Sequence, residues 1–237
     1  MTTQTQNKGL DYEVGNYEVG RTLLKPRGTN LTFAHPSYRP NTYAEVKQAI
    51  EQDNLRTPTM AETASLVHAA FNSDDIYSQE IKGLMKNKWM WAFTGILYTP
   101  ELGYVEDDPR TRDGMPYMDE SDLIKKLEAG DPSVRTFNYG YKIKEMSPID
   151  LAKNEFVQVL AGKEGAEKLA EVAGKYKTQP YLYGYESVSQ PETRVSALDS
   201  CRDFDHWLRV NGYIHGYSRY GYAFGVQKTG EASRTEN

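Results

Sequence analysis

The sequence predicts an α+β fold in a single compact domain with short helices and twisted antiparallel strands. Three observations predict it. Helix caps recur along the chain, aromatic and β-branched segments lie between the capped stretches, and no linker rich in Pro, Gly or Ser divides the 237 residues. The apolar fraction is only 38% while the aromatic fraction is 12%, so aromatic side chains must supply much of the core.

The first elements are short strands. Residues 1–10 are expected to be disordered, residues 11–228 to form the domain, and residues 229–237 to form a disordered tail. The repeated YEVG at 12–15 and 17–20 predicts two short β segments with Gly at a turn. Residues 31–33 predict a strand that stops at His35-Pro36, because proline has no N–H for the ladder.

Two helices are predicted by capping boxes. Thr42 with Glu45, and Thr59 with Glu62, have the spacing at which a Thr hydroxyl and a Glu carboxylate satisfy each other's backbone N–H groups. Apolar residues follow each box at helical spacing.

Two more helices are predicted further along. One covers residues 121–129 and ends at Gly130. The other begins after Ser147, with Pro148 at the first helical position, and continues to residue 175 with a break near Gly162. Residues 89–98 predict strand or bulge structure, and residues 134–141 and 181–188 predict extended strands with alternating Tyr.

Composition and charge exclude several classes of function. The net charge is −5 and no long basic run occurs, so nucleic acid is a poor partner. No apolar run approaches the roughly 20 residues of a membrane span, and the N-terminus lacks the apolar core of a conventional signal peptide. We therefore expect a soluble protein, with display on a cell surface or virion left open. One cysteine, Cys201, excludes an internal disulfide and a multi-cysteine zinc site, and no cofactor is expected.

Residues 199–226 (DSCRDFDHWLRVNGYIHGYSRYGYAFGV) differ in composition from the rest of the chain. These 28 residues contain no Lys, Glu, Gln or Met, although all four are plentiful in the preceding 198. Tyr and Trp offer rigid contact area, Ser, Gly and Asn offer adaptable hydrogen bonds, and Arg adds charged donors, as in antibody-like binding surfaces. The segment therefore predicts a ligand-binding surface at 199–223.

The candidate binding residues are the polar and aromatic side chains of that region. Tyr and Trp would supply contact area, while Arg, Asp and His would set electrostatic selectivity. The ligand-binding set is Ser200, Cys201, Arg202, Asp203, Phe204, Asp205, His206, Trp207, Arg209, Asn211, Tyr213, His215, Tyr217, Ser218, Arg219, Tyr220 and Tyr222. The expected inward-facing anchors are Ala197, Leu198, Val210, Ala223, Phe224 and Val226.

Metal and catalytic motifs are weak. Asp203, Asp205 and His206 form the only cluster that could hold a transition metal, but a strand would place His206 on the opposite side from the two carboxylates. Residues 106–109 (EDDP) with Asp113 could attract Ca²⁺, although they lack regular ligand spacing, so a solvated acidic turn is favoured. His35 and His68 are interpreted as structural, and no catalytic residue is expected.

Two segments far apart in the chain resemble a known family. Residues 55–62 (LRTPTMAE) resemble the R-L-P-T-x-A-E-W signature that opens a helix in C-type lectin folds of the formylglycine-generating-enzyme type. Residues 223–226 (AFGV) resemble the G-F-R-V strand that closes that fold. The chain is similar to variable proteins of diversity-generating retroelements, which include phage tropism determinants, and especially to archaeal viral or cellular members. The resemblance implies a C-type lectin fold whose exposed binding face precedes the closing strand.

The resemblance also implies a source for the unusual composition. In these retroelements, template adenines are copied with errors, so Asn codons become codons for Tyr, Asp, His, Ser, Gly, Arg, Cys, Phe, Leu, Ile, Val or Ala. They do not become codons for Lys, Glu, Gln, Met or Trp. Residues 199–226 fit this pattern, with Trp207 as a fixed position and Cys201 as a chance product. The enzyme branch of the fold has two cysteines five residues apart. Here Ser196 and His206 stand at those offsets from Cys201, which argues against oxidase chemistry.

The expected function is recognition. We expect a non-enzymatic display protein whose surface at 199–222 binds variable, macromolecular targets, such as a protein or another ligand on a cell surface. A monomer is the default expectation, with an oligomer left open. One alternative is a structural virion or assembly protein that uses the Tyr- and Arg-rich face as a fixed subunit interface. Another is an enzyme of the formylglycine-generating type, with a titratable pair such as Asp203 and His206.

Overall fold

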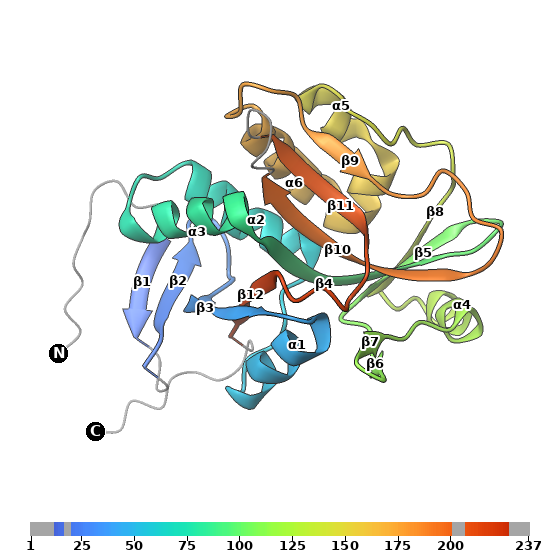
Figure 1. The fold of residues 1–237 in the computed structure, drawn as a ribbon, viewed down its shortest axis with the longest axis horizontal. Helices are drawn as coiled ribbons and strands as arrows, with labels where there is room; N and C mark the ends of the chain where they lie inside the picture. The colour runs from blue at the N-terminus through green and yellow to red at the C-terminus, as the bar shows by residue number, and fades with distance from the viewer. Residues whose placement is uncertain (1–11, 17–19, 201–206, 228–237) are drawn as a thin grey trace.

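The molecule is organised around one large β-sheet (Figure 1). The computed structural model describes residues 12–16, 20–200 and 207–227. Within these residues the large sheet contains ten strands: β1 (Tyr12–Asn16), β2 (Thr22–Pro26), β3 (Phe33–Asn41), β4 (Trp89–Tyr98), β5 (Gly103–Asp107), β8 (Val134–Phe137), β9 (Tyr181–Tyr183), β10 (Glu192–Ser200), β11 (Leu208–Ile214) and β12 (Gly221–Val226). Strands β6 (Thr111–Arg112) and β7 (Met115–Pro116) form a separate hairpin.

Strand β4 is the hub of the sheet. The strand order is β1-β2-β3-β12-β4-β10-β11-β9, and β5 with β8 branches from β4. The start of β4 pairs with β12 and its later part pairs with β5, while β10 runs along its other edge. Most pairs are antiparallel; β12 with β4 and β11 with β9 are parallel.

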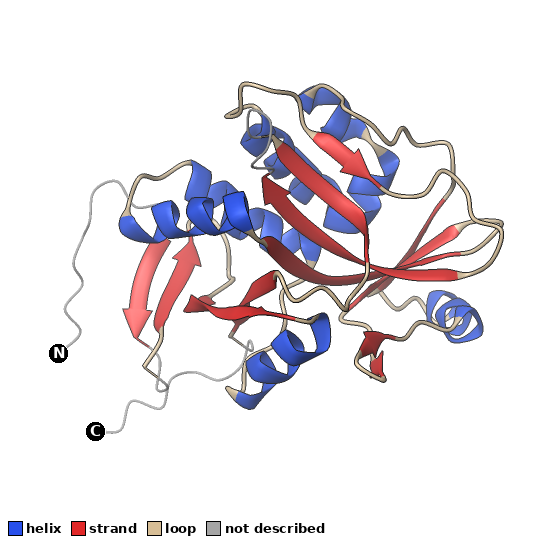
Figure 2. Cartoon of the chain, in the orientation of Figure 1, coloured by secondary structure: helices blue, strands red, loops and turns tan. Residues whose placement is uncertain are grey.

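Helices cover both faces of the sheet (Figure 2). They are α1 (Tyr43–Gln52), α2 (Met60–Phe71), α3 (Ile76–Asn87), α4 (Glu120–Glu128), α5 (Pro148–Lys153) and α6 (Glu155–Ala173). Helices α2, α3 and α6 share a hydrophobic core with one face of the sheet, α1 shares a second core with the other face, and α4 packs against β5 and β8. The result is a mixed α/β fold in a single compact domain with short helices and a mostly antiparallel, twisted sheet.

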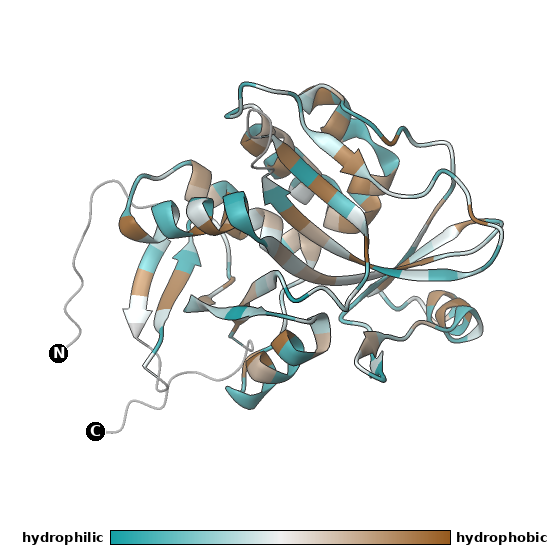
Figure 3. Cartoon of the chain, viewed as in Figure 1, coloured by the Kyte–Doolittle hydropathy of each residue, from teal (hydrophilic) through white to brown (hydrophobic). Residues whose placement is uncertain are grey.

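The two cores follow from alternation along the central strands (Figure 3). In β4, Met90 and Ala92 belong to the core beneath α2, α3 and α6, whereas Trp91 and Phe93 belong to the core beneath α1. Successive strand residues point to opposite faces, so a strand covered on both sides is apolar throughout. This explains why β4 reads WMWAFTGILY rather than as an apolar-polar alternation.

Both predicted capping boxes are confirmed. Both Thr42 and Thr59 accept from the N–H three residues on, and Glu45 and Glu62 complete the two boxes. The helix expected at 121–129 is α4, which begins one residue earlier because Asp119 is its N-cap.

Two helical expectations need correction. The helix predicted to run from 148 to 175 is two helices, because Asn154 ends α5 and its side chain caps α6; Gly162, at φ 70°, adds the expected break. Helix α3 was not expected from the sequence. Its N-cap is Asp75, whose carboxylate accepts from two backbone N–H groups, and its inward residues are widely spaced in a polar segment.

The bounds predicted for the strand at 31–33 are also wrong. Strand β3 starts at Phe33 and continues past Pro36 to Asn41. Its pairing with β12 shifts register between Ala34 and Tyr38, so Pro36 lies in a bulge where no ladder hydrogen bond is required.

The Tyr-rich segments form shorter strands than expected, and tyrosines beyond or opposite the strand ends bond to loop carbonyls. Strand β8 ends at Phe137, and the Tyr139 hydroxyl donates to the Thr99 carbonyl at 2.6 Å. Strand β9 ends at Tyr183, and the Tyr141 hydroxyl donates to the Tyr185 carbonyl at 2.6 Å. Alternating tyrosines in these segments therefore indicate where rings pack, and they do not predict how far a strand extends.

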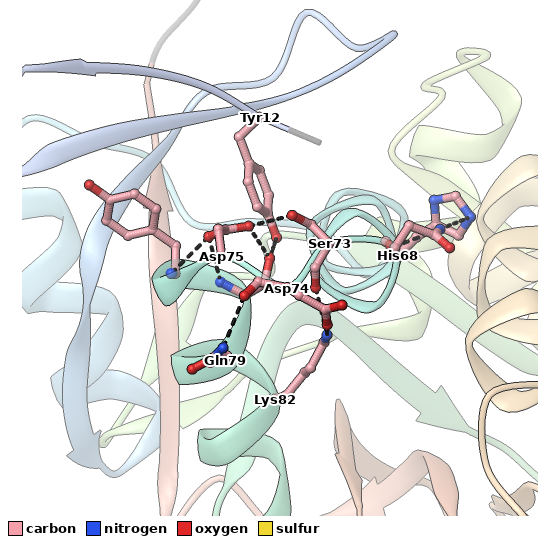
Figure 4. A network of polar contacts seen from close by, with 10 residues as sticks. Tyr12, His68, Ser73, Asp74, Asp75, Gln79 and Lys82 are labelled. Carbon is pink, nitrogen blue, oxygen red and sulfur yellow. Dashed lines mark hydrogen bonds and ion pairs between the residues drawn. The ribbon is translucent and has the colours of Figure 1, made fainter. Parts of the chain in front are cut away.

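A polar network ties strand β1 to the α2–α3 connection (Figure 4). The Asp75 carboxylate accepts from the hydroxyls of Ser73 and Ser78 at 2.5 and 2.6 Å, and these bonds lower its pKa against the opposing effect of burial. The Tyr12 hydroxyl lies 3.3 Å from Ser78 Oγ. The edge strand is therefore anchored to α3 by a buried tyrosine.

Candidate functional site

Alternate side chains of β11 point to opposite faces of the sheet, and a β-bulge in the strand reverses which residues face which side. Leu208 and Val210 are buried against the α2–α3–α6 core. In β10, Ala197 pairs with Asn211 but Val195 pairs with Ile214, so β11 carries one extra residue. Ile214 consequently packs in the α1 core.

The bulge leaves Tyr213 at the surface with 45% of its area exposed. Its backbone N–H donates to the Asn211 side chain at 2.9 Å. Its ring packs 4.8 Å from the Tyr185 ring, and Arg194 donates to the Tyr185 hydroxyl at 2.6 Å. Tyr213 is thus exposed on one side and supported on the other, which is the geometry of a rigid contact residue.

The β11–β12 connection, residues 215–220, is held by its backbone. The Gly216 carbonyl accepts from the Tyr43 N–H at 2.9 Å, at the first residue of α1. The Tyr220 carbonyl accepts from the Trp89 N–H at 3.2 Å, at the first residue of β4. Both bonds use main-chain groups, so the path of the connection does not depend on which side chains it exposes.

The side chains of the connection point largely to solvent. Tyr217 and Tyr220 are 66% and 64% exposed. His215 and Arg219 are exposed and Ser218 is half-buried. Exposed tyrosines on a fixed backbone offer contact area at a small cost in side-chain entropy.

Strand β12, in contrast to the exposed connection before it, is fully buried. All six of its residues are buried, and it lies between β3 and β4 in the sheet. A Cβ at Gly221 would overlap the indole of Trp91, and one at Gly225 would lie 2.6 Å from Leu55 Cδ1. Glycine is required at both positions because neighbouring side chains occupy the space.

The structure divides the expected binding residues into three groups. Tyr213, His215, Tyr217, Arg219 and Tyr220 are exposed, and Trp207, Arg209, Asn211 and Ser218 are half-buried. Ser200 and Tyr222 were wrongly assigned to the surface, because they are 2% and 0% exposed, in β10 and in the centre of the sheet. Cys201, Arg202, Asp203, Phe204, Asp205 and His206 lie outside the described residues.

The expected anchors are confirmed as buried. Each is at most 1% exposed: Ala197, Leu198, Val210, Ala223, Phe224 and Val226. The face that carries the exposed residues therefore rests on a fully packed layer.

An ion pair joins the ends of β10 and β11. The Asp199 carboxylate is buried and bonds the guanidinium of Arg209, which lies 5.9 Å from the Tyr183 ring centroid on β9. Burial raises the pKa of Asp199 to about 6, although the Arg209 charge opposes this. Three strands are thus connected through one side chain of the expected binding set.

Cation–tyrosine contacts surround the β11–β12 connection, and sequence reasoning missed them. Lys88 Nζ lies 5.3 Å from the Tyr220 ring centroid, and Arg112 Cζ lies 3.6 Å from that of Tyr117. Lys88 and Tyr220 are far apart in the chain, so no local pattern could have paired them; Arg112 and Tyr117 are five residues apart, but their segment is far in sequence from the connection.

The acidic segment at 106–109 is a set of ion pairs rather than a solvated turn. Glu106 is buried and pairs with Lys126, and Asp107 accepts from Arg135 at 2.7 and 3.0 Å. Asp108 pairs with Lys47. In the part of the chain that the structure describes, no group of three His, Cys, Asp or Glu residues is placed to hold a metal ion.

The two segments that carry the family resemblance lie side by side. The Arg56 N–H donates to the Val226 carbonyl at 2.9 Å, and the Val226 N–H donates to the Arg56 carbonyl at 2.7 Å. Arg56 also makes a two-point ion pair with Glu62 at 2.6 and 2.5 Å. Residues 55–62 and 223–226 therefore meet at the start of α2.

Comparisons with known proteins leave the chain without an identified relative. No protein-family model matches it, and neither the curated proteins nor the solved structures contain a match. In the described ranges, no helix is both long and apolar enough to cross a membrane.

Proposed function

We propose that the protein is a non-enzymatic binding protein that recognises macromolecular ligands through the exposed residues of β11 and the β11–β12 connection. The observation that carries this proposal is the separation of roles in one short segment. Tyr213, Tyr217 and Tyr220 are exposed, while the connection between them is fixed by main-chain hydrogen bonds. Such a surface can change its side chains without changing its fold.

We further propose that the scaffold is a C-type lectin fold of the diversity-generating retroelement type. The hydrogen bonds between Arg56 and Val226 support this, because they join the two segments on which the resemblance rests. The position of the exposed residues immediately before the closing strand β12 also supports it.

Sequencing the coding DNA and its flanks tests the diversification mechanism. We expect a near-copy of the codons for residues 199–226 that differs only at adenines, beside a reverse-transcriptase gene. Absence of such a copy would contradict the mechanism and favour the alternative of a fixed subunit interface. Sedimentation equilibrium then decides that alternative, since an interface variant such as Tyr217→Glu would dissociate the oligomer.

A display library tests the binding function directly. The five exposed positions are randomised in one library, and five anchors (Leu198, Val210, Ala223, Phe224 and Val226) are randomised in a control library. We expect the first library to stay folded and to yield binders when sorted against purified, unrelated proteins. Equal loss of folding in both libraries would overturn the proposal.

A further inference from the structure

Two cations beside the β11–β12 connection differ from the other cations that contact aromatic rings. Four such cations in the described residues also pair with a carboxylate: Arg21, Lys82, Arg194 and Arg209. Lys88 and Arg112 contact a tyrosine ring, yet no carboxylate of the described chain pairs with either. Among the described residues, an aromatic ring positions these two cations and no carboxylate neutralises their charge.

Both cations belong to elements that lie beside the β11–β12 connection. Lys88 precedes Trp89, whose N–H binds the Tyr220 carbonyl. Arg112 pairs in the β6–β7 hairpin with Met115, and a Cβ at Gly216 would lie 3.3 Å from the Met115 sulfur. The hairpin and the start of β4 therefore flank the connection.

Arg219 adds a third cation from within the connection. It is exposed, and it lies close enough to Glu45 to help lower the pKa of that carboxyl, after the larger effect of the hydrogen bond from Thr42. The Glu45 carboxylate already accepts from the Thr42 hydroxyl at 2.6 Å. The Glu45 carboxylate also accepts from the Thr42 backbone N–H as part of the α1 capping box.

We infer that this surface, which we call the cation–tyrosine rim (Lys88, Arg112, Tyr117, Arg219 and Tyr220), binds a carboxylate-rich segment of a partner protein. The inference rests on the proposed function and names the class of partner. A cation held over a ring loses little side-chain entropy when a carboxylate arrives, and complementary charge selects the partner. Lys88, Arg112 and Tyr117 lie outside residues 199–223, so this part of the rim stays when Arg219 and Tyr220 change.

The rim fits a protein carboxylate better than a nucleic acid. Duplex or single-stranded binding relies on neutralising many phosphates along a track, whereas the rim offers three cations on a chain of net charge −5. Tyr and Arg are both enriched among the hot-spot residues of protein–protein interfaces.

Fluorescence anisotropy with defined probes tests the inference on the full chain. The probes are a short labelled Glu-rich peptide, the same peptide with Gln or with Lys in place of Glu, and an oligothymidylate of equal length. We expect the Glu peptide to bind about tenfold more tightly than the Gln peptide, as for several steered charge pairs, and more tightly than the oligothymidylate.

Charge-reversal variants locate the binding. K88E/R112E/R219E is expected to weaken binding of the Glu peptide by about tenfold or more, and to bind the Lys peptide instead. The matched control K142E/K163E/K175E makes the same change in net charge at exposed lysines on the α5–α6 side, and we expect less than about a threefold loss.

Each contrary result overturns the inference. Equal binding of the Glu and Gln peptides, equal loss in the control variant, tighter binding of oligothymidylate, or no binding of any peptide would each do so. These results are independent of the codon comparison and of the display library, so the rim can fail while the proposed function stands. Conversely, a failed library with a positive peptide result would leave a fixed acidic-partner site.

Discussion

Strand β12 and the connection that precedes it are held in place by different means. In β12, side chains determine the structure: Phe224 is 1% exposed, and Gly221 leaves room for the Trp91 ring. In the β11–β12 connection, main-chain bonds to α1 and β4 determine the structure, and Tyr217 is 66% exposed. The boundary between the two regimes falls within two residues, from Tyr220 to Tyr222.

The difference shows where this chain can vary. A residue whose side chain fills a core is constrained by volume and shape. A residue that contributes only its backbone N–H or C=O is constrained by conformation alone. In the connection, residue 215 and residues 217–220 belong to the second class, whereas Gly216 is buried and a Cβ there would lie 3.1 Å from Pro116 Cδ. Four measurements test this distinction.

The largest expected effect is at the centre of β12. Phe224→Ala should lower the free energy of unfolding by about 3–5 kcal/mol, because it removes a fully buried ring. Tyr217→Ala should change it by less than about 0.5 kcal/mol. Urea denaturation of both variants measures the contrast, and losses of similar size would remove the distinction.

The next effect concerns the boundary itself. Gly221→Ala should destabilise the protein by about 1–3 kcal/mol, since the new methyl group overlaps the Trp91 indole and forces it to move. Gly83→Ala in helix α3 is the control, because a Cβ there meets open space, and it should stabilise by about 0.5–1 kcal/mol. Thermal unfolding of the pair tests both signs; a neutral Gly221→Ala would show that β12 tolerates side-chain growth.

A third effect depends on pH. Burial raises the pKa of Asp199 to about 6 despite the Arg209 charge, against roughly 3.9 in an unfolded chain. A carboxyl with a raised folded-state pKa stabilises the fold fully below its unfolded-state pKa, and this contribution is lost as pH rises through about 6. The stability of Asp199→Asn relative to the natural chain should therefore increase between about pH 4 and pH 7. A difference that stays constant with pH would show that Asp199 does not titrate in this range; the unpaired Arg209 adds only a constant offset.

The smallest effect is at the cation–tyrosine rim. Lys88 lies 5.3 Å from the exposed Tyr220 ring centroid, and such a contact at the surface is worth about 0.5–1 kcal/mol. A double-mutant cycle with Lys88→Ala and Tyr220→Leu should give a coupling in or below this range. A coupling above about 2 kcal/mol would show that side-chain contacts hold this part of the connection, as they hold β12.

The sequence predicted correctly those features whose determining contacts lie within a few residues, and it failed where the contacts lie far along the chain. Thr42 and Thr59 cap their helices through atoms three residues away, so spacing alone was sufficient. The course of β3 past Pro36 depended on a register shift against β12, far along the chain, and the prediction was wrong.

The candidate site follows the same rule. Composition identified the segment, and the apolar residues Val210, Ala223 and Phe224 are buried as predicted. Tyr222 resembles its exposed neighbours in sequence, but the position of β12 between β3 and β4 buries it. Lys88 and Arg112 could not be linked to the site, because only the fold brings β4 and the β6–β7 hairpin to the connection.

The place of β12 in the sheet also bears on the order of folding. Residues 221–226 fill the gap between β3 and β4, so the two sides of the sheet join only after nearly the whole described chain has been synthesised. Contacts between residues so far apart in sequence form slowly, and until they form both strand edges stay open to other chains. A ribosome that stops before residue 221 would therefore release a molecule whose sheet is divided between β3 and β4, with two unpaired edges exposed to aggregation.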